Sequence, residues 1–324
     1  MSATNIPKFA FILKESYGPA SFENDLGFAI LLAMQTSDQT TQSMLKMVWA
    51  AISFGVMATF VKVACKTLPS IEVVFFRSFL GSIAMGLIIF KEGASWRGKN
   101  FKILMLRGIF GFAALSLHFY AISKLHLGTA VMLNYTAPIF VVILARLILG
   151  ERTTWLVKSA IAFSFVGLYL LVASQFEIKA IPILVGILSG IFAAVAYVLI
   201  RYNDEGESPY TIIFYFTTIS TIGSLPLLAL NFHWPNFGEW LALLGVSAGA
   251  FFGQVWMTRS IQSAPVSFVV PFSYLTPVFA AVLGVVFWKE YLSLQTLIGG
   301  CVIIVSGILI YLFREKMSFI PLEE

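Results

Sequence analysis

The amino-acid sequence predicts an all-α integral membrane protein with ten transmembrane helices in two inverted five-helix repeats. Its 324 residues are 59% hydrophobic and only 11% charged, with a mean hydropathy of +0.89. A soluble domain carries about 25% charged residues. Apolar runs of roughly 20 residues, the length that crosses a bilayer as a helix, recur along the chain. The alternating segments of ~10 residues that are typical of a membrane barrel are missing from the sequence.

An internal duplication predicts the two repeats. Residues 133–151 and 272–290, aligned without a gap, share five of nineteen positions. The identities are Tyr135/Tyr274, Pro138/Pro277, Phe140/Phe279, Leu144/Leu283 and Glu151/Glu290. The polar and proline positions carry the signal, because apolar composition alone does not place them.

The ten predicted spans fall into two copies of five. They cover roughly 45–66, 69–90, 102–123, 127–149, 154–173, 180–201, 210–230, 237–262, 265–288 and 294–313. The first repeat then occupies residues 45–178 and the second 179–313, between a polar tail at 1–44 and a short tail at 314–324.

The distribution of Lys and Arg predicts the orientation. With the N-terminus inside, the inner segments hold fourteen basic residues and the outer segments four, while three fall within spans. The positive-inside rule therefore puts both termini in the cytoplasm, at the cell inner membrane. Because five spans per copy is an odd number, the second copy must be inverted. Inverted repeats characterise secondary transporters, whose substrate site lies near the middle of the membrane.

Residues 1–44 differ from the rest of the chain. Leu26–Met34 is too short an apolar run to span a bilayer, and no signal-peptide pattern is present. We expect a flexible cytoplasmic tail with a weak surface helix at 26–34. A start codon placed too early is the alternative, since Met44 and Met47 stand where the first span begins.

Pro138 and Pro277 are predicted to kink the fourth and ninth spans. Proline lacks an N–H and clashes with the carbonyl four residues before it, which frees the carbonyls of Asn134 and Ser273. Free acceptors at membrane depth must face protein or a watery cavity. We favour a cavity lining over a packing kink, because the proline is repeated at matched positions.

Seven polar or aromatic residues are candidates for binding substrate. His118 lies midway along the third span, in a stripe of small residues that starts at Arg107. An intramembrane ionisable group is a functional candidate, although a hydrogen-bonded core histidine remains the alternative. For Gln254 and Trp256 a structural hydrogen bond is equally open. The full set is His118, Asn134, Tyr135, Gln254, Trp256, Ser273 and Tyr274.

Other features are interpreted as structural. Arg77 is expected to pair or snorkel, and Glu151 and Glu290 to close their helices at opposite membrane faces. Gly245, Gly249 and Gly253, four residues apart, indicate a helix-packing face. Neither cofactor nor metal is predicted, since the two cysteines and three histidines are scattered, and a net charge of +5 does not indicate nucleic acid.

These residues resemble the EamA family of the drug/metabolite transporter superfamily. The match runs from Ala130 to Glu151 and from Val266 to Glu290, with Arg77 in Phe-Phe-Arg-Ser and with Leu106-Arg-Gly108. The resemblance covers roughly residues 45–313 and implies ten spans around a central cavity that opens alternately to each side. Thr217 stands where Arg77 would recur, so a role of that arginine would belong to one copy.

The function predicted is secondary transport of a small polar or amphipathic metabolite. The resemblance suggests an amino acid, a nucleoside or an S-adenosylmethionine-like solute, with proton or exchange coupling, in a monomer or homodimer. An integral-membrane enzyme for prenyl or acyl transfer is the alternative. Such an enzyme needs carboxylate clusters or a His/Asp pair, but none of the three aspartates falls within a predicted span.

Overall fold

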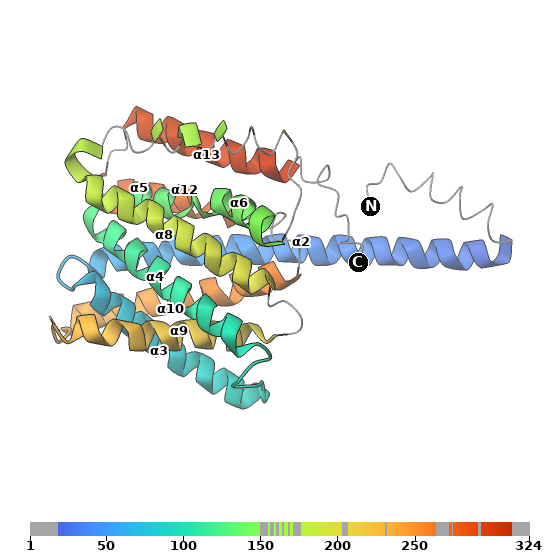
Figure 1. Cartoon of the computed structure of the whole chain (residues 1–324), viewed down its shortest axis with the longest axis horizontal. Helices are drawn as coiled ribbons and strands as arrows, with labels where there is room; N and C mark the ends of the chain where they lie inside the picture. Colours follow the sequence, from blue (N-terminus) through green and yellow to red (C-terminus); the bar gives the residue numbers. More distant parts are fainter. Residues whose placement is uncertain are drawn as a thin grey trace.

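The computed structural model is a bundle of helices. It describes residues 19–149, 155, 159, 162, 163, 165–167, 169, 170, 176–202, 207–230, 232–263, 272, 273, 275–290 and 293–312, and this part of the chain contains no strand. The principal helices are α2 (Pro19–Ala64), α3 (Ser70–Glu92), α4 (Phe101–Lys124), α5 (Leu127–Asn134), α6 (Ala137–Leu149), α8 (Phe176–Tyr202), α9 (Pro209–Leu228), α10 (Phe237–Ser263), α12 (Leu275–Trp288) and α13 (Leu294–Leu312) (Figure 1). The predicted all-α class is confirmed for these residues.

Six helices among the described residues are long and apolar enough to cross a membrane. They are Thr41–Ala64, Ser70–Glu92, Phe101–Lys124, Ala180–Ile200, Pro209–Leu228 and Phe237–Ser263. Each corresponds to one predicted span, while most of the predicted span at 154–173 lies outside the described residues. The count of ten spans stays a prediction. Large apolar side chains such as Leu87, Phe90 and Phe287 are exposed on the bundle, as expected for a surface that faces lipid.

Helix α2 begins earlier than the sequence suggested. It starts at Pro19, so the stretch expected to be a flexible tail with a short helix at 26–34 is continuous with the first span. Two features account for this. Proline is well suited to the first turn of a helix, and no proline interrupts the chain between Pro19 and Pro69.

The predicted fourth span is two helices rather than one kinked helix. α5 ends at Asn134 and α6 begins at Ala137. At the break, the Thr136 hydroxyl donates to the Leu133 carbonyl at 2.7 Å. Pro138 is the second residue of α6 and Pro277 the third of α12. A proline tolerates the first turn of a helix because the N–H that it lacks would have no partner there.

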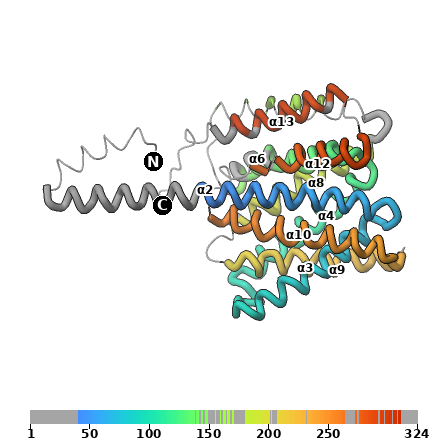
Figure 2. Tube along the Cα trace, turned by 180° about the vertical axis from the view of Figure 1, so that it is seen from behind, coloured from blue at the N-terminus to red at the C-terminus, as the bar shows by residue number. Residues whose placement is uncertain are grey.

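The helices of the two predicted copies pack mainly on one another. α2 lies against α10 and α12, α8 lies against α4 and α6, and α3 lies against α9. The repeat alignment exchanges α2 with α8, α4 with α10 and α6 with α12, so these contacts form matched pairs. Figures 1 and 2 show α2 running between α10 and α12.

The glycines of α10 allow it to approach α2 closely. A Cβ atom on Gly249 would lie 2.9 Å from the Ser53 carbonyl oxygen and 3.0 Å from the Met57 backbone nitrogen. Gly245 and Gly253 of α10 lie over aromatic rings of α2. The predicted packing face is therefore confirmed, and its partner is the first helix of the other copy.

Candidate functional site: a central cavity

A cavity lies where helices from both copies meet. Its empty volume is about 650 Å³, which includes open solvent at its mouth. The lining residues come from α2, α3, α4, α5, α8, α9, α10 and α12, together with the α5–α6 break. They are Phe54, Met57, Ala58, Arg77, Arg107, Gly111, Ala114, Leu115, His118, Val131, Asn134, Tyr135, Ala193, Ala196, Tyr197, Phe216, Gln254 and Thr276.

Four of the seven candidate binding residues line this cavity: His118, Asn134, Tyr135 and Gln254. They come from α4, α5, the α5–α6 break and α10, so the fold brings together side chains that are far apart in sequence. His118 Nδ1 and Gln254 Oε1 are buried and have no hydrogen-bond partner among the described residues. Polar atoms of this kind are uncommon in proteins and call for an explanation.

Trp256 and Ser273 do not belong to the described lining of the cavity. Trp256 packs against an apolar cluster that includes Ile212 and Ile261. Ser273 is half-buried in a short turn of 3₁₀ helix before α12 and is not part of the lining. Tyr274 lies outside the described residues, as does Glu151. Pro277 is buried in α12, and its neighbour Thr276 reaches the cavity instead.

The break between α5 and α6 is covered by α8. The Asn134 side-chain amide donates to the Ser189 hydroxyl at 3.0 Å. A Cβ atom on Gly190 would lie 3.1 Å from the carbonyl oxygens of Asn134 and Leu133. The acceptor that Pro138 was expected to free therefore packs against the backbone of α8, while the Asn134 residue itself still borders the cavity.

Two buried arginines are the main feature of the cavity that sequence reasoning did not assign to binding. Arg77 of α3 is 2% exposed and Arg107 of α4 is 3% exposed. Both guanidinium groups face the ring of Phe216, at 4.9 Å and 4.4 Å from its centroid. Because both lie against one ring, the two charges are at most about 9 Å apart. At that separation they repel each other by about 2 kcal/mol at an effective dielectric constant of 20. The Nε and Nη1 atoms of each arginine have no acceptor among the described residues.

Gly111 provides the space for this arrangement. A Cβ atom there would collide with Arg107 Nη1 and would lie 2.7 Å from the Phe216 ring. The small residue, one turn beyond Arg107 on α4, thus lets the guanidinium fold back over its own helix. In the sequence, Arg107 stood out only as the start of a small-residue stripe and as part of the Leu106-Arg-Gly108 motif. The sequence did contain a signal for a binding role of Arg77 and Arg107, because charged residues inside apolar helices mark substrate or ion pathways.

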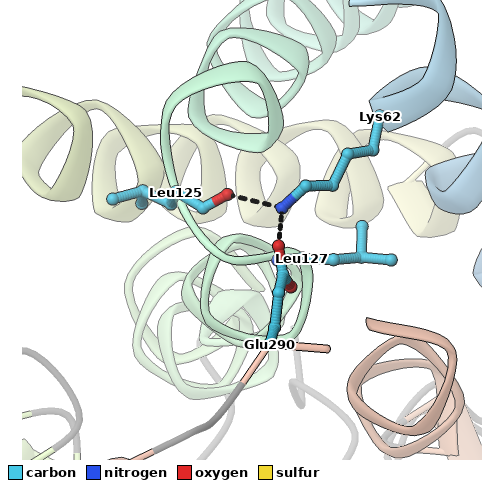
Figure 3. Close-up of polar contacts among 4 residues, drawn as sticks. All are labelled: Lys62, Leu125, Leu127 and Glu290. Carbon is cyan, nitrogen blue, oxygen red and sulfur yellow. Dashed lines mark hydrogen bonds and ion pairs between the residues drawn. The ribbon is translucent and has the colours of Figure 1, made fainter. Parts of the chain in front are cut away.

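A second polar cluster lies at the other end of α5 (Figure 3). The Glu290 carboxylate forms an ion pair with Lys62 of α2 and accepts a hydrogen bond from Leu127 N at 2.8 Å. Lys62 also donates to the Leu125 carbonyl at 3.0 Å. Because Leu127 is the first residue of α5, the carboxylate caps a helix N-terminus, where negative charge is favourable. Glu290 thus connects α2, α5 and the end of α12.

The chain turns sharply to place Glu290. Lys289 has φ 52°, the left-handed conformation that often ends a helix, and its N–H bonds to the Val285 carbonyl at 3.0 Å. The backbone N–H of Glu290 reaches the Gly284 carbonyl at 3.3 Å. In the described residues Lys62–Glu290 is the sole ion pair, and no cluster of three or more His, Cys, Asp or Glu side chains there could hold a metal ion.

Comparison with known proteins identifies the kind of protein to which this geometry belongs. The sequence profile of the EamA-like transporter family matches residues 41–173 and again residues 180–312. The pseudopaline exporter CntI of Pseudomonas aeruginosa is 33% identical over 276 residues, which cover 84% of this chain and 96% of the exporter. The S-adenosylmethionine uptake transporter of Rickettsia prowazekii is 27% identical over 255 residues, covering 78% and 85%.

Two further matches extend the comparison. An uncharacterized transporter of Helicobacter pylori is 30% identical, covering 81% of this chain and 92% of that protein. A solved crystal structure superposes with a TM-score of 0.66 at 16% identity, covering 86% of this chain and 99% of the other. At that identity the likeness shows a shared fold. The resemblance read from the sequence is confirmed, and the names of the relatives indicate transport and not lipid modification.

Proposed function

The chain belongs to the EamA-like transporter family, and from this membership and the central cavity we propose that it is a secondary transporter working by alternating access. Its solute would be a small polar or amphipathic metabolite crossing the cytoplasmic membrane, such as an amino acid, a nucleoside or an S-adenosylmethionine-like compound. One observation carries the proposal: a single cavity is lined by helices of both EamA repeats. A site between repeats is where such transporters bind their substrates.

The relatives support a metabolite transporter without specifying direction. One is named an exporter of pseudopaline and another an uptake transporter for S-adenosylmethionine. Related chains thus carry different solutes in opposite directions. We keep import and export open for this chain, together with the mode of coupling.

Alternating access would use the pairing of helices across the repeats. α2 packs on α10 and α12, and α8 packs on α4 and α6, so the repeats can exchange roles if they are inverted. A rocking motion of one half would then open the cavity to one side while closing it to the other. Both termini would lie in the cytoplasm, as the positive-inside count predicts.

The Lys62–Glu290 pair would fasten the outer end of the bundle. The predicted orientation puts Lys62, Leu127 and Glu290 near the external face, where α2, α5 and α12 meet. The ion pair holds these helices together and would have to break or slide when the cavity opens outward. Glu151 occupies the matching position in the first repeat, and we propose that it acts at the inner face.

Within the cavity, four residues would contact the solute. The amides of Asn134 and Gln254, the Tyr135 hydroxyl and the His118 imidazole offer hydrogen bonds to a polar group. Tyr274 stays in the proposal as the second-repeat partner of Tyr135.

Flux into proteoliposomes would test the proposal. The purified chain is reconstituted, loaded internally with pools of amino acids, nucleosides or S-adenosylmethionine, and assayed for exchange against the labelled solute outside. We expect saturable flux of at least one pool that empty liposomes do not show. No flux of any pool in either direction would contradict the proposal.

A further inference from the structure

We infer that the transported solute carries an oxyanion group, a carboxylate or a phosphate, that binds to Arg77 and Arg107. Among the proposed solutes, this favours an amino acid or an S-adenosylmethionine-like compound, which carry a carboxylate, over a nucleoside. This inference rests on the proposed function, in which the central cavity holds the solute. It assigns to Arg107 a binding role, and it moves Arg77 from a structural role to the same site.

The first argument is the charge balance of the cavity. Two arginines line it, and none of the described residues in its lining is acidic. Four of the described carboxylates are occupied elsewhere: Glu72 accepts from His233 N, Glu207 from Lys99 N, Glu239 from Asn236 N, and Glu290 from Lys62. Another, Glu92, is exposed at the end of α3.

Burial makes the two uncompensated positive charges energetically costly when no ligand is bound. Buried charges in proteins are paired or hydrogen-bonded, because taking a charge out of water is expensive. Arg77 and Arg107 are both almost fully buried, and each keeps two nitrogens, Nε and Nη1, without an acceptor among the described residues. A bound anion supplies the missing charge and the missing acceptors together.

The geometry suits an oxyanion in particular. Guanidinium is a planar fork of donors that matches carboxylate and phosphate oxygens, often with two parallel hydrogen bonds. Both forks make cation–π contacts with the Phe216 ring, at 4.9 Å and 4.4 Å from its centroid. Gly111 leaves room for the Arg107 fork. The two donors are thus held in position before any solute arrives.

The rest of the lining indicates the chemistry of the other end of the solute. Tyr135, Tyr197 and Gln254 border the cavity together with apolar side chains such as Met57 and Leu115. This surface fits a neutral polar or amphipathic part. Cations without an oxyanion group, such as diamines, are disfavoured, because they would enter a site that already holds two positive charges.

Ligand-induced thermal stabilisation tests the inference on the full chain in phosphatidylcholine nanodiscs. The probes are glutarate and glycerol phosphate as oxyanions, glutaramide as a neutral analogue and cadaverine as a cation. We expect an oxyanion to raise the unfolding midpoint with saturation, and the neutral and cationic probes to have no saturable effect. In Arg77→Gln and in Arg107→Gln the half-saturating concentration should rise roughly ten- to a hundredfold, since each loses charged hydrogen bonds.

Arg259→Gln is the matched control. Arg259 contacts the Tyr210 ring and hydroxyl outside the cavity, and its loss should leave the oxyanion titration unchanged. Three results would overturn the inference: equal stabilisation by glutaramide or cadaverine, unchanged titration in both cavity variants, or stabilisation only by adding phosphatidylglycerol. The last result would assign the arginines to a lipid headgroup.

A second measurement separates binding from folding. Without ligand, Arg77→Gln and Arg107→Gln should unfold at or above the wild-type midpoint, because each removes an unpaired buried charge. A large fall in both would show that the arginines hold the fold, and would refute the inference. If proteoliposomes carry only solutes without an oxyanion group and Arg107→Gln matches wild-type flux, the transporter proposal stands and the oxyanion inference falls. Absence of flux for every solute would instead count against the transporter proposal, while oxyanion titration still reports on the site.

Discussion

The Lys62–Glu290 ion pair allows a quantitative prediction of coupling between distant segments. Glu290→Gln keeps the size of the side chain and one carbonyl oxygen that can accept from Leu127 N, but removes the charge that faces Lys62. The two side chains are 15% and 11% exposed, so the pair is nearly buried. Removing one partner from a buried pair costs about 3–5 kcal/mol, and hydrogen bonds to charged groups contribute about 1.5–3 kcal/mol.

We expect Glu290→Gln to lower the free energy of unfolding by about 2–3 kcal/mol. This value is at or just below the lower end of the cost for a fully buried pair, because water reaches part of this pair. Lys62→Met should cost a similar amount. In the double variant the losses should not add, and the coupling energy should be about 1–3 kcal/mol. Reversible unfolding in mixed detergent micelles, followed by circular dichroism, measures the cycle.

Lys66 provides the matched control for this cycle. Its ammonium group lies 5.9 Å from the Trp288 ring, close to the 5.8 Å of Lys62, yet the described structure gives it no ion pair. Lys66→Met combined with Glu290→Gln should therefore be additive. Additive losses for Lys62 and Glu290, within about 0.5 kcal/mol, would refute the view that this pair connects α2 to α5 and α12.

Three further predictions concern the cavity and its surroundings. Gly111→Ala should raise the half-saturating oxyanion concentration about tenfold in the thermal assay, because the methyl group displaces the Arg107 guanidinium; an unchanged value would show that the position of that group is unimportant. Gly249→Ala should lower the free energy of unfolding by about 1–3 kcal/mol, because the added methyl group overpacks against the α2 backbone. Gly238→Ala is the control in the same unfolding assay and should be close to neutral, because its Cβ would meet its nearest atom at 3.4 Å. His118→Ala and Asn134→Ala should lower flux at least tenfold while membrane insertion, measured by blotting of membrane fractions, is retained; wild-type kinetics in both would remove them from the site.

The sequence predicted the class of the protein because bilayer chemistry constrains it strongly. Low charge and apolar runs permit few alternatives, and the helices observed follow from them. Four cavity residues were found by a related argument: polar groups such as His118 and Gln254 in apolar helices need a reason to be there. Trp256 was predicted with them but does not belong to the described lining of the cavity. Two residues apart on a helix is a rotation of about 200°, so it lies on a different face from Gln254 and joins an apolar cluster.

Other features depended on contacts between distant segments. Arg107 was visible as a charge in a span, but only the fold shows that it shares the Phe216 ring with Arg77 and that no described carboxylate faces either of them. Pro138 indicated an interruption of the fourth span. That Gly190 of α8 covers the carbonyls at the break could not be read from the sequence, because an isolated glycine in an apolar helix has many uses.

Alternating exposure of the cavity is the central claim, and cysteine accessibility tests it most directly. The two native cysteines, Cys65 and Cys301, are replaced by serine, and Ala114→Cys introduces a thiol in the cavity lining. Val286→Cys, at an exposed apolar position of α12, serves as the lipid-facing control. A membrane-impermeant thiol reagent should modify the cavity cysteine from either side, in right-side-out and in inside-out vesicles, and should leave the control cysteine unmodified. Modification from neither side, or from one side alone under every solute condition, would contradict the account.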